Sequence, residues 1–407
     1  MIAHSVLLSQ LDTLLVQSCE LWQVKAFDCD ALPWQERFPH LAECVWSLDD
    51  CELDNIDKVQ ADLLAYLLPS LKADLADLGL EWRLELLDIK APSTQTHQSE
   101  VIGQQDAGHF SAGIKGRKWA QINAFTQQID NGQSEVLEWC AGKGHLGRLI
   151  AKAYDRQVVS LEWQQGLCEA GEVFAKQWQL PQRFICADAF DAQQSELKVE
   201  QQVVALHACG DLHVRLLHLA TKAGTRDIAI SPCCYHLIQA QEYQAMSRLG
   251  IKSELRLTRH DLQLPLQQST IANEKQLSLR HKEIAWRLGF DCLQRDVREV
   301  SQYLPIPSIK QSQLSGEFAT FCVWAAEQKA VTLPKEVDFE HFLYLGIERQ
   351  KLTRRVDLVA HLFRAVFEHW LLLDRVCFLE EQGYQVSLEA FCDNAITPRN
   401  SLIKAKR

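Results

Sequence analysis

Three acidic side chains occupy equivalent places in the sequence, each near the end of a short apolar run. Glu138 lies near the end of the run 136–139, Glu162 near the end of the run 158–163, and Asp188 follows Cys186. A carboxylate placed after a strand accepts hydrogen bonds from ribose hydroxyls or from an amino group. Three such acids after three successive strands are more specific than a lone loop motif. They indicate a site for a ligand that contains a nucleoside.

A loop that contains glycine follows Glu138 and leads into a helical pattern. Glycine lets the backbone approach a ligand, and the start of a helix offers free N–H groups. The spacing from Gly142 to Gly147 formally matches the Gly-x-Gly-x-x-Gly pattern of NAD-binding proteins. In such a site Glu138 would face a pyrophosphate, whereas S-adenosylmethionine has no phosphate and carries a cationic amine. We therefore expect S-adenosylmethionine, with Glu162 at its ribose and Asp188 at its adenine.

Strand and helix patterns alternate through the middle of the chain, which predicts a parallel sheet with helical crossovers. A long helical pattern at 349–382 and two strand patterns separated by a Thr-Pro-Arg-Asn turn end the chain. The expected fold is α/β, a Rossmann-like seven-stranded sheet whose last two strands pair antiparallel. The expected strands are 136–139, 158–163, 184–186, 203–209, 228–231, 384–392 and 401–405, with helices that include 212–223 and 238–250.

The loop after the first strand resembles the first motif of class I S-adenosylmethionine-dependent methyltransferases, acid-x-Gly-x-Gly-x-Gly. Cys140 stands where that motif has its first glycine. The resemblance implies that S-adenosylmethionine is the cofactor of an enzyme that transfers methyl groups. The positions expected to bind it are Glu138, Cys140, Gly142, Gly144, Leu146, Glu162, Trp163, Asp188 and His207.

A narrower resemblance rests on three segments, 138–146, 207–212 and 231–236. They are similar to a methyltransferase-domain family that includes methyltransferase-like protein 25 and the glutathione S-transferase C-terminal-domain-containing protein. The turn 397–400 is similar to that family's closing turn, and 115–122 to its basic first helix. The resemblance covers about 112–260 and 350–407 and implies the cofactor but not the methyl acceptor.

Two cysteine-containing segments follow the fourth and fifth expected strands, His207-Ala-Cys209-Gly-Asp and Ser231-Pro-Cys-Cys-Tyr-His236. Because the carboxyl ends of parallel strands meet at one edge of a sheet, both segments should flank one cleft. We expect His207 to contact the cofactor or to act as a base. The candidate catalytic residues are His207, Cys233, Cys234 and Tyr235.

Several interpretations of the second segment remain open. It resembles the Pro-Pro-aromatic motif of amino-group methyltransferases, in which the ring, here Tyr235, stacks on a base. Cys233 or Cys234 could instead be a nucleophile for cytosine methylation, if a nearby histidine lowers its pKa. The thiols also have metal-ligand chemistry, but no Cys-x-x-Cys spacing supports zinc, and no metal is expected. The simplest alternative is that the cysteines are small packing residues.

Charge is unevenly distributed along the chain. Residues 1–95 contain 17 acidic and 6 basic side chains, which equals the net charge of −11 for all 407 residues, so the remainder is neutral. We expect four parts: an acidic helical domain at 1–95, a core at 112–260, an insertion at 261–345 and a closing segment at 346–407. Residues 92–112 are polar and suggest a linker. The acidic domain should avoid nucleic acid and contact a protein partner.

Two basic segments lie elsewhere, at 115–118 and 248–287. A solvated face is the simpler interpretation of each, since 248–310 has a net charge of only +4. The functional interpretation is a path for RNA, and tRNA or rRNA is the first expectation for the acceptor. A scaffold that holds cofactor without turnover, or a methyltransferase for proteins or small molecules, is the alternative.

No apolar stretch approaches the ~20 residues of a membrane helix, and the N-terminus has no signal-peptide pattern. The 14 cysteines fall mostly within apolar runs of a chain without a dense disulfide framework. We therefore expect reduced thiols, a cytoplasmic location and no membrane contact.

Overall fold

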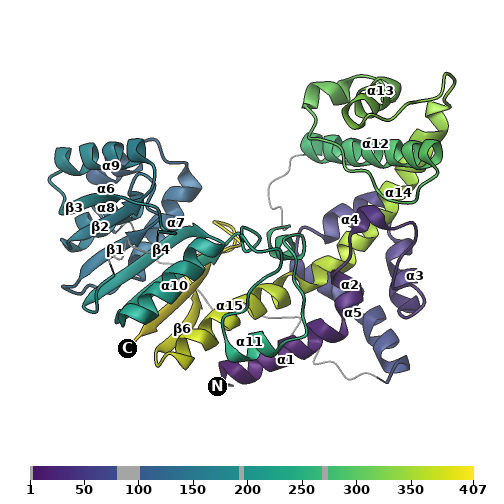
Figure 1. Cartoon of the computed structure of the whole chain (residues 1–407). Coiled ribbons are helices and arrows are strands. Elements are labelled where there is room, and N and C mark those ends of the chain that lie inside the picture. The colour runs from purple at the N-terminus through teal and green to yellow at the C-terminus, as the bar shows by residue number, and fades with distance from the viewer. Residues whose placement is uncertain (1–2, 80–100, 192–196, 268–273) are drawn as a thin grey trace. The chain divides into compact units, whose positions relative to one another are not determined.

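The computed structural model describes residues 3–79, 101–191, 197–267 and 274–407 (Figure 1). Contacts divide the chain into two compact units. Unit 1 comprises Met1–Thr13, Ile89–Leu266 and Val366–Arg407, and unit 2 comprises Leu14–Asp88 and Gln267–Ala365. The boundaries of these two units differ from those of the four parts expected from the sequence. The four-part division stays a prediction. Among the described residues, no helix has the length and apolar character needed to cross a membrane.

A seven-stranded sheet of order β3-β2-β1-β4-β5-β7-β6 forms the centre of unit 1. The first five strands pair in parallel, while β7 pairs antiparallel with both β5 and β6. The Rossmann-like seven-stranded sheet expected from the sequence is therefore confirmed. The strands are β1 (Glu135–Trp139), β2 (Val158–Glu162), β3 (Gln182–Cys186), β4 (Gln201–Cys209), β5 (Asp227–Cys233), β6 (Gln385–Ala390) and β7 (Ser401–Lys406).

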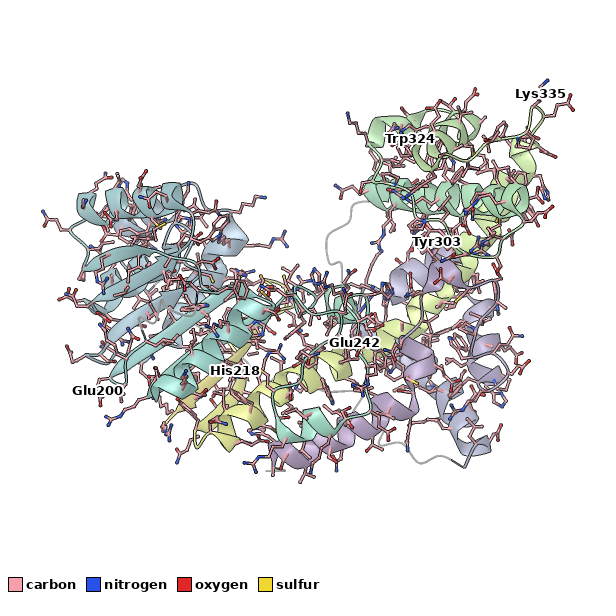
Figure 2. The ribbon with its side chains drawn as sticks, viewed as in Figure 1. Glu200, His218, Glu242, Tyr303, Trp324 and Lys335 are labelled. Carbon is pink, nitrogen blue, oxygen red and sulfur yellow. The ribbon has the colours of Figure 1, made fainter. Side chains whose placement is uncertain are left out.

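Helices cover both faces of this sheet. Leu137 and Trp139 of β1 belong to the apolar cluster that includes residues of α10 and α15, while Val136 belongs to the cluster with α7 and α8. Burial on both faces is typical of parallel sheets. His218 of α10, labelled in Figure 2, packs edge-on against Phe378 of α15 with ring centroids 4.9 Å apart. The helices are α6 (Gln104–Ser111), α7 (Gly116–Gln127), α8 (His145–Tyr154), α9 (Gln165–Gln177), α10 (Asp211–Ala223), α11 (Arg248–Lys252) and α15 (Arg364–Glu381).

The helix expected at 238–250 is wrong for most of its length, since α11 begins only at Arg248. A buried carboxylate replaces the helical hydrogen bonds. Asp374 accepts the backbone N–H groups of Met246 (2.9 Å) and Ser247 (2.8 Å) and the hydroxyls of Ser247 (2.6 Å) and Tyr243 (2.6 Å). The segment after β5 is therefore held as a loop against α15.

Unit 2 is helical. The helical expectation for the N-terminal region is confirmed for its described residues, by α2 (Cys19–Trp22), α3 (Pro39–Ser47), α4 (Asp50–Ile56) and α5 (Gln60–Asp77); α1 (His4–Gln17) starts in unit 1. The insertion expected at 261–345 contains α12 (Glu274–Arg298), α13 (Phe318–Lys329) and the start of α14 (Phe339–Ala360). Gly346 lies where α14 meets α12, and a Cβ there would overlap the backbone of Gly289.

Two further expectations need correction. The continuous helix expected at 349–382 is interrupted by the 3-10 turn His361–Phe363 between α14 and α15. In the linker expected at 92–112, residues 104–111 form α6, and Phe110 packs edge-on against Phe174 of α9. Residues 92–100 lie outside the described part of the chain.

The Asp374 contacts generate a stability prediction. Asp374→Ala leaves two hydroxyls and two backbone N–H groups without their buried acceptor, so the free energy of unfolding should fall by about 3–5 kcal/mol. Urea denaturation followed by circular dichroism measures this change. The exposed acid Glu254 is the control, and Glu254→Gln should leave the midpoint unchanged. Equal midpoints for the two variants would contradict the role given to Asp374.

Candidate functional site

The loop between β1 and α8 contains three residues with positive φ, Cys140 (56°), Gly142 (59°) and Gly144 (66°). The backbone N–H of Ala141 donates to the carbonyl of Leu161 (2.9 Å), which attaches the loop to β2. A left-handed conformation costs a residue with a side chain about 1–2 kcal/mol. Cys140 adopts it nevertheless, so the loop has the bend that a glycine would allow at this position.

Glu138 lies beneath this loop and is only 4% exposed. Its Oε2 accepts the Ser160 hydroxyl (2.7 Å), and the backbone N–H groups of Gly147 and Leu146 also donate to the carboxylate. Burial nevertheless raises the pKa of Glu138 to about 7. The carboxylate expected to face a ligand amine thus supports the first turn of α8. The side chain of Leu146, also expected at the site, is buried in the apolar cluster next to α8.

Glu162 connects the loop to the end of β2. Its Oε2 accepts the N–H of Gly142 (2.9 Å), and its Oε1 accepts the N–H of Gln164 (3.0 Å). Each carboxylate oxygen has two lone pairs, so Glu162 keeps capacity for further hydrogen bonds. The next residue, Trp163, is 68% exposed. An acceptor and a large open ring therefore stand together at this strand end.

Asp188 is exposed after β3, where its Oδ1 accepts the N–H of Phe190 (2.9 Å). Phe190 is itself 40% exposed. Since β2 and β3 are neighbours in parallel, Trp163 and Phe190 follow adjacent strands at one edge of the sheet. Sequence reasoning missed Phe190, although an aromatic residue two positions after the expected adenine-binding acid was a usable signal.

The end of β4 contains a β-bulge. Leu206 pairs with Ser231, whereas Cys209 pairs with Cys233, so β4 has one residue more than β5 over this interval. His207 lies in the bulge with φ 73° and an exposed side chain. Desolvation and the charge of Lys118 lower its pKa. Bulges are frequent beside active sites because they redirect a side chain.

The bulge brings three thiols together. The sulfur atoms of Cys209, Cys233 and Cys234 all lie within 4.8 Å of one another, and those of Cys209 and Cys233 are 3.3 Å apart. Cys234 has φ 48°. Gly210, with φ 56°, is needed because a Cβ there would overlap the carbonyl of Leu237. The structure thus places His207 and both cysteine segments at adjacent strand ends.

The ring of Tyr235 is buried, whereas stacking on a substrate base would require an exposed ring. It is 1% exposed, and its hydroxyl donates to Glu368 (3.4 Å) while the Arg375 guanidinium lies 5.1 Å from its ring centroid. Burial raises the pKa of its hydroxyl well above the usual value. In this conformation the ring has no free face for a substrate base.

The two basic segments differ in how much of their charge is available. Lys115, Arg117 and Lys118 are exposed. Desolvation lowers the pKa of both His145 and His207, and the charge of Lys118 adds to this effect at each. Residues 248–266 belong to unit 1, whereas the described residues 274–287 belong to unit 2. In this second segment three basic side chains donate to backbone carbonyls: Arg259 to Gln239, Lys282 to Leu314, and Arg287 to Ile306.

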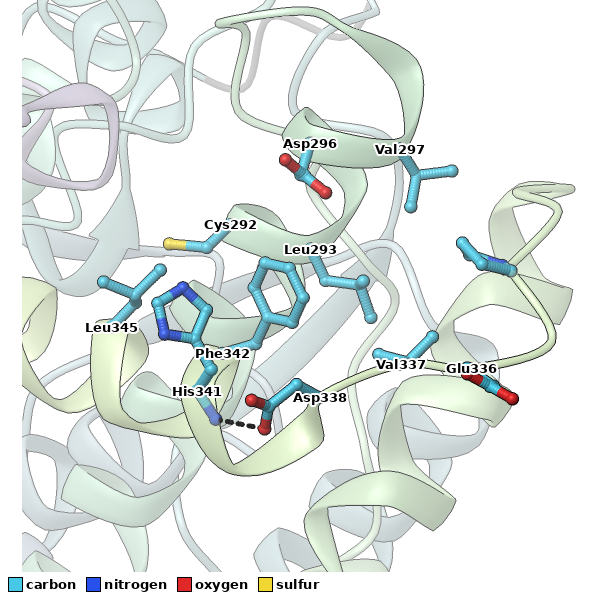
Figure 3. Close-up of a pocket in the computed structure, with 11 residues that line it drawn as sticks. Cys292, Leu293, Asp296, Val297, Glu336, Val337, Asp338, His341, Phe342 and Leu345 are labelled. Atoms are coloured by element: carbon cyan, nitrogen blue, oxygen red, sulfur yellow. Dashed lines mark hydrogen bonds between the residues drawn. The ribbon is translucent and has the colours of Figure 1, made fainter.

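An open cavity of about 620 Å³ lies within unit 2 (Figure 3). Cys292, Asp296 and His341 contribute to its wall, and the N–H of His341 donates to Asp338 (3.0 Å) at the start of α14. None of the residues expected to bind a ligand lines it. The strand ends of unit 1 therefore remain the candidate site.

This sheet order, with a glycine-bearing loop after β1 and acids at or just after the ends of β1, β2 and β3, defines a class I S-adenosylmethionine-dependent methyltransferase fold. Residues 117–241 match the model of a family described as a methyltransferase domain. This segment contains β1 to β5, the loop and both cysteine segments. The chain therefore contains a methyltransferase domain of the class that uses S-adenosylmethionine. A comparison with curated proteins found no match.

Solved structures with local similarity include the YcgJ protein from Bacillus subtilis, with 13% identity over 27% of this chain and 49% of that chain, TM-score 0.24. An rRNA methylase from Streptococcus thermophilus has 10% identity over 30% of this chain and 73% of that chain, TM-score 0.23. A SAM-dependent methyltransferase from Agrobacterium tumefaciens has 15% identity over 32% and 48%, TM-score 0.25. The chain thus spans about half the length of the first and third structures, and similarity this low says nothing about a substrate.

The buried Glu138 generates a pH prediction. Burial raises its pKa from 4.5 to about 7, so the folded state binds the proton more tightly than the unfolded chain does. Its contribution to stability is therefore lost as pH rises from about 4.5 to about 7. Glu138→Gln lacks this loss, so the stability of the variant relative to wild type should rise by about 2–3 kcal/mol across this window.

Urea denaturation of both proteins at pH 5 and pH 8 measures the difference. Glu368 and Asp357, whose pKa values burial also raises to about 7, are present in both proteins and cancel in the comparison. Glu169→Gln, on exposed α9 surface, is the control. A difference between wild type and Glu138→Gln that is the same at both pH values would contradict the prediction.

Proposed function

We propose that this protein is an S-adenosylmethionine-dependent methyltransferase whose acceptor is RNA, with tRNA or rRNA as the first class to test. The observation that carries the enzymatic part is a set of polar and aromatic groups at adjacent strand ends. They are the Glu162 carboxylate, which accepts the N–H of Gly142 in the β1 loop, the exposed Asp188, and the exposed rings of Trp163 and Phe190. A methyltransferase domain matched over 117–241 supports the same reaction.

The proposed binding mode assigns each part of the cofactor to a strand end. Gly142 and Gly144 bring the loop backbone to the methionine part, and Glu162 accepts the ribose hydroxyls. Asp188 accepts the adenine amino group. Trp163 and Phe190 are exposed beside those two acids and offer apolar surface to the adenine. Glu138 acts beneath the loop, because its hydrogen bonds go to Ser160 and to the first turn of α8.

The sulfonium methyl is then expected at the ends of β4 and β5. His207 is exposed there, and desolvation together with the Lys118 charge lowers its pKa, which favours the neutral imidazole. A neutral imidazole can accept a proton from an acceptor hydroxyl or a cationic amine. His207 is therefore the proposed base, and its exposed position is the reason to prefer it to the buried Tyr235.

Cofactor affinity tests the assignment. Glu162→Ala removes two charge-assisted hydrogen bonds, one to the loop at Gly142 and one to Gln164, together with the proposed ribose acceptor. The Kd for S-adenosylmethionine should therefore rise at least about tenfold. Isothermal calorimetry measures it, with Glu169→Gln as the control that should bind like wild type. An unchanged Kd for Glu162→Ala would show that Glu162 is assigned wrongly. Failure of wild type to bind either S-adenosylmethionine or S-adenosylhomocysteine would overturn the function itself.

Exposed cations beside the site support RNA as the acceptor. Lys115, Arg117 and Lys118 precede or begin α7, and Lys143 is exposed in the cofactor loop itself. Among the described residues, none of the four takes part in an ion pair. Lys118 acts electrostatically on both His145 and His207. Positive charge therefore lies near the start of α8, directly after the loop, and near the proposed base. Phosphates bind such groups by releasing counterions.

Salt-dependent binding tests the acceptor. Replacing Lys115, Arg117 and Lys118 by Ala should weaken tRNA or rRNA binding and reduce the slope of log K against log salt by about 2–3. Affinity for S-adenosylmethionine should stay unchanged. The control replaces three exposed lysines elsewhere, Lys176, Lys222 and Lys335. Transfer of labelled methyl groups from the purified protein into extract protein or small molecules, with none in RNA, would overturn the RNA proposal and leave the methyltransferase proposal standing.

A scaffold that binds cofactor without turnover is the alternative function, and Cys140 in a glycine position of the motif is one reason to consider it. Cys140 has the positive φ that the motif needs, so this substitution no longer favours the scaffold. The labelling experiment separates the two, since a scaffold binds the cofactor and transfers no methyl group to any fraction.

A further inference from the structure

The three thiols at the ends of β4 and β5 have the spacing of a metal-binding group. The sulfurs of Cys209, Cys233 and Cys234 lie within 4.8 Å of one another, with one separation of 3.3 Å. Zinc bonds to sulfur are about 2.3 Å long, so two thiolates on a tetrahedral zinc lie about 3.8 Å apart. The separation of Cys209 and Cys233 is below this value, and the other separations do not exceed 4.8 Å. Other described sets of His, Cys, Asp and Glu side chains do not converge in this way.

Local backbone geometry explains how the sulfurs converge. In an unbroken β4–β5 register, Cys209 would pair with Cys234, but the extra residue in the bulge pairs it with Cys233. Cys234 then turns in a left-handed conformation (φ 48°) directly after β5. The N–H of Gly210 donates to the carbonyl of Cys233 (3.1 Å), and the N–H of Leu237 to the carbonyl of Cys234 (3.0 Å). The bulge in β4 and the left-handed conformation of Cys234 thus both help to bring the three sulfurs together.

A nearby cation suits a thiolate cluster. Arg399, in the turn before β7, is close enough to interact electrostatically with both Cys209 and Cys234. Its Nη2 donates to the carbonyl of Leu266 (3.1 Å), while its buried Nε has no hydrogen-bond partner among the described residues. A zinc ion with three thiolates has a net charge of −1, which a guanidinium can balance.

We propose that Cys209, Cys233 and Cys234 are the three protein ligands of a Zn²⁺ ion at the ends of β4 and β5. Three thiolates select soft or borderline cations over Mg²⁺ or Ca²⁺. Three protein ligands leave the fourth tetrahedral position open, which is the pattern of catalytic rather than structural zinc. A simple disulfide uses two sulfurs and gives no role to the third. The proposal concerns metal binding and does not depend on methyl transfer.

Metal content tests the proposal on the full chain. Protein purified without chelator should contain about one zinc per chain by elemental analysis. After removal of zinc and addition of Co²⁺, the spectrum should show a thiolate-to-cobalt charge-transfer band and the visible bands of tetrahedral cobalt. Cys209→Ser and Cys234→Ser should each lose the charge-transfer intensity and at least about tenfold in zinc affinity. Cys51→Ser, at an exposed thiol outside the cluster, should retain both.

Circular dichroism of each variant separates loss of metal from loss of fold, and the wild-type cobalt spectrum is independent of any variant. Copper or iron in place of zinc would overturn the identity of the ion. The proposed site would be overturned if wild-type protein contained no metal and gave no cobalt spectrum after addition of Co²⁺. This holds whether or not Cys209 and Cys233 are found in a disulfide. Isothermal calorimetry with S-adenosylmethionine tests the proposed function separately, because the Kd for the cofactor is measured independently of the metal.

Discussion

A buried polar chain joins the first three strands, and the cofactor loop depends on it. Gln182 of β3 donates to the Ser160 hydroxyl of β2 (2.8 Å), and that hydroxyl donates to Glu138 of β1 (2.7 Å). The same Gln182 amide also lies 3.2 Å from the carbonyl of Gly144, to which it donates. A Cβ on Gly147 would overlap both Glu138 and Gln182. Because buried polar groups stabilise only when each one is paired, the loop can take few other shapes.

This arrangement separates support from recognition. The hydrogen bonds of Glu138 go to Ser160 and to the first turn of α8, whereas Glu162 and Asp188 accept hydrogen bonds from loop backbone near the strand ends. Glu162 is 5% exposed, and Asp188 is exposed at the edge of the sheet. A ligand therefore meets groups whose positions are already set, which lowers the ordering cost of binding. At the ends of β4 and β5, the β4 bulge also sets the positions of side chains, because it exposes His207 and pairs Cys209 with Cys233.

Much of the fold could be predicted from the sequence because it rests on local periodicity. The alternating runs gave five parallel strands and the closing pair, and acids near strand ends located the site. The meeting of Cys209 with Cys233 could not be predicted, since 24 residues separate them and the bulge sets the register. The loop at 238–247 was mistaken for a helix because its hydrogen-bond acceptor, Asp374, lies more than 120 residues away in sequence. Burial of Tyr235 likewise depends on long-range partners, Glu368 and Arg375.

Cys140 places a thiol in the loop proposed to hold a sulfonium compound, which is an alkylating agent. A thiolate there would compete with the acceptor for the methyl group and inactivate its own protein. Burial, followed by the charge of Glu162, raises the pKa of Cys140 to about 12, so the sulfur stays protonated and weakly nucleophilic at neutral pH. Burial, assisted by the same carboxylate that holds the loop, thus protects the side chain that replaces a glycine from self-alkylation.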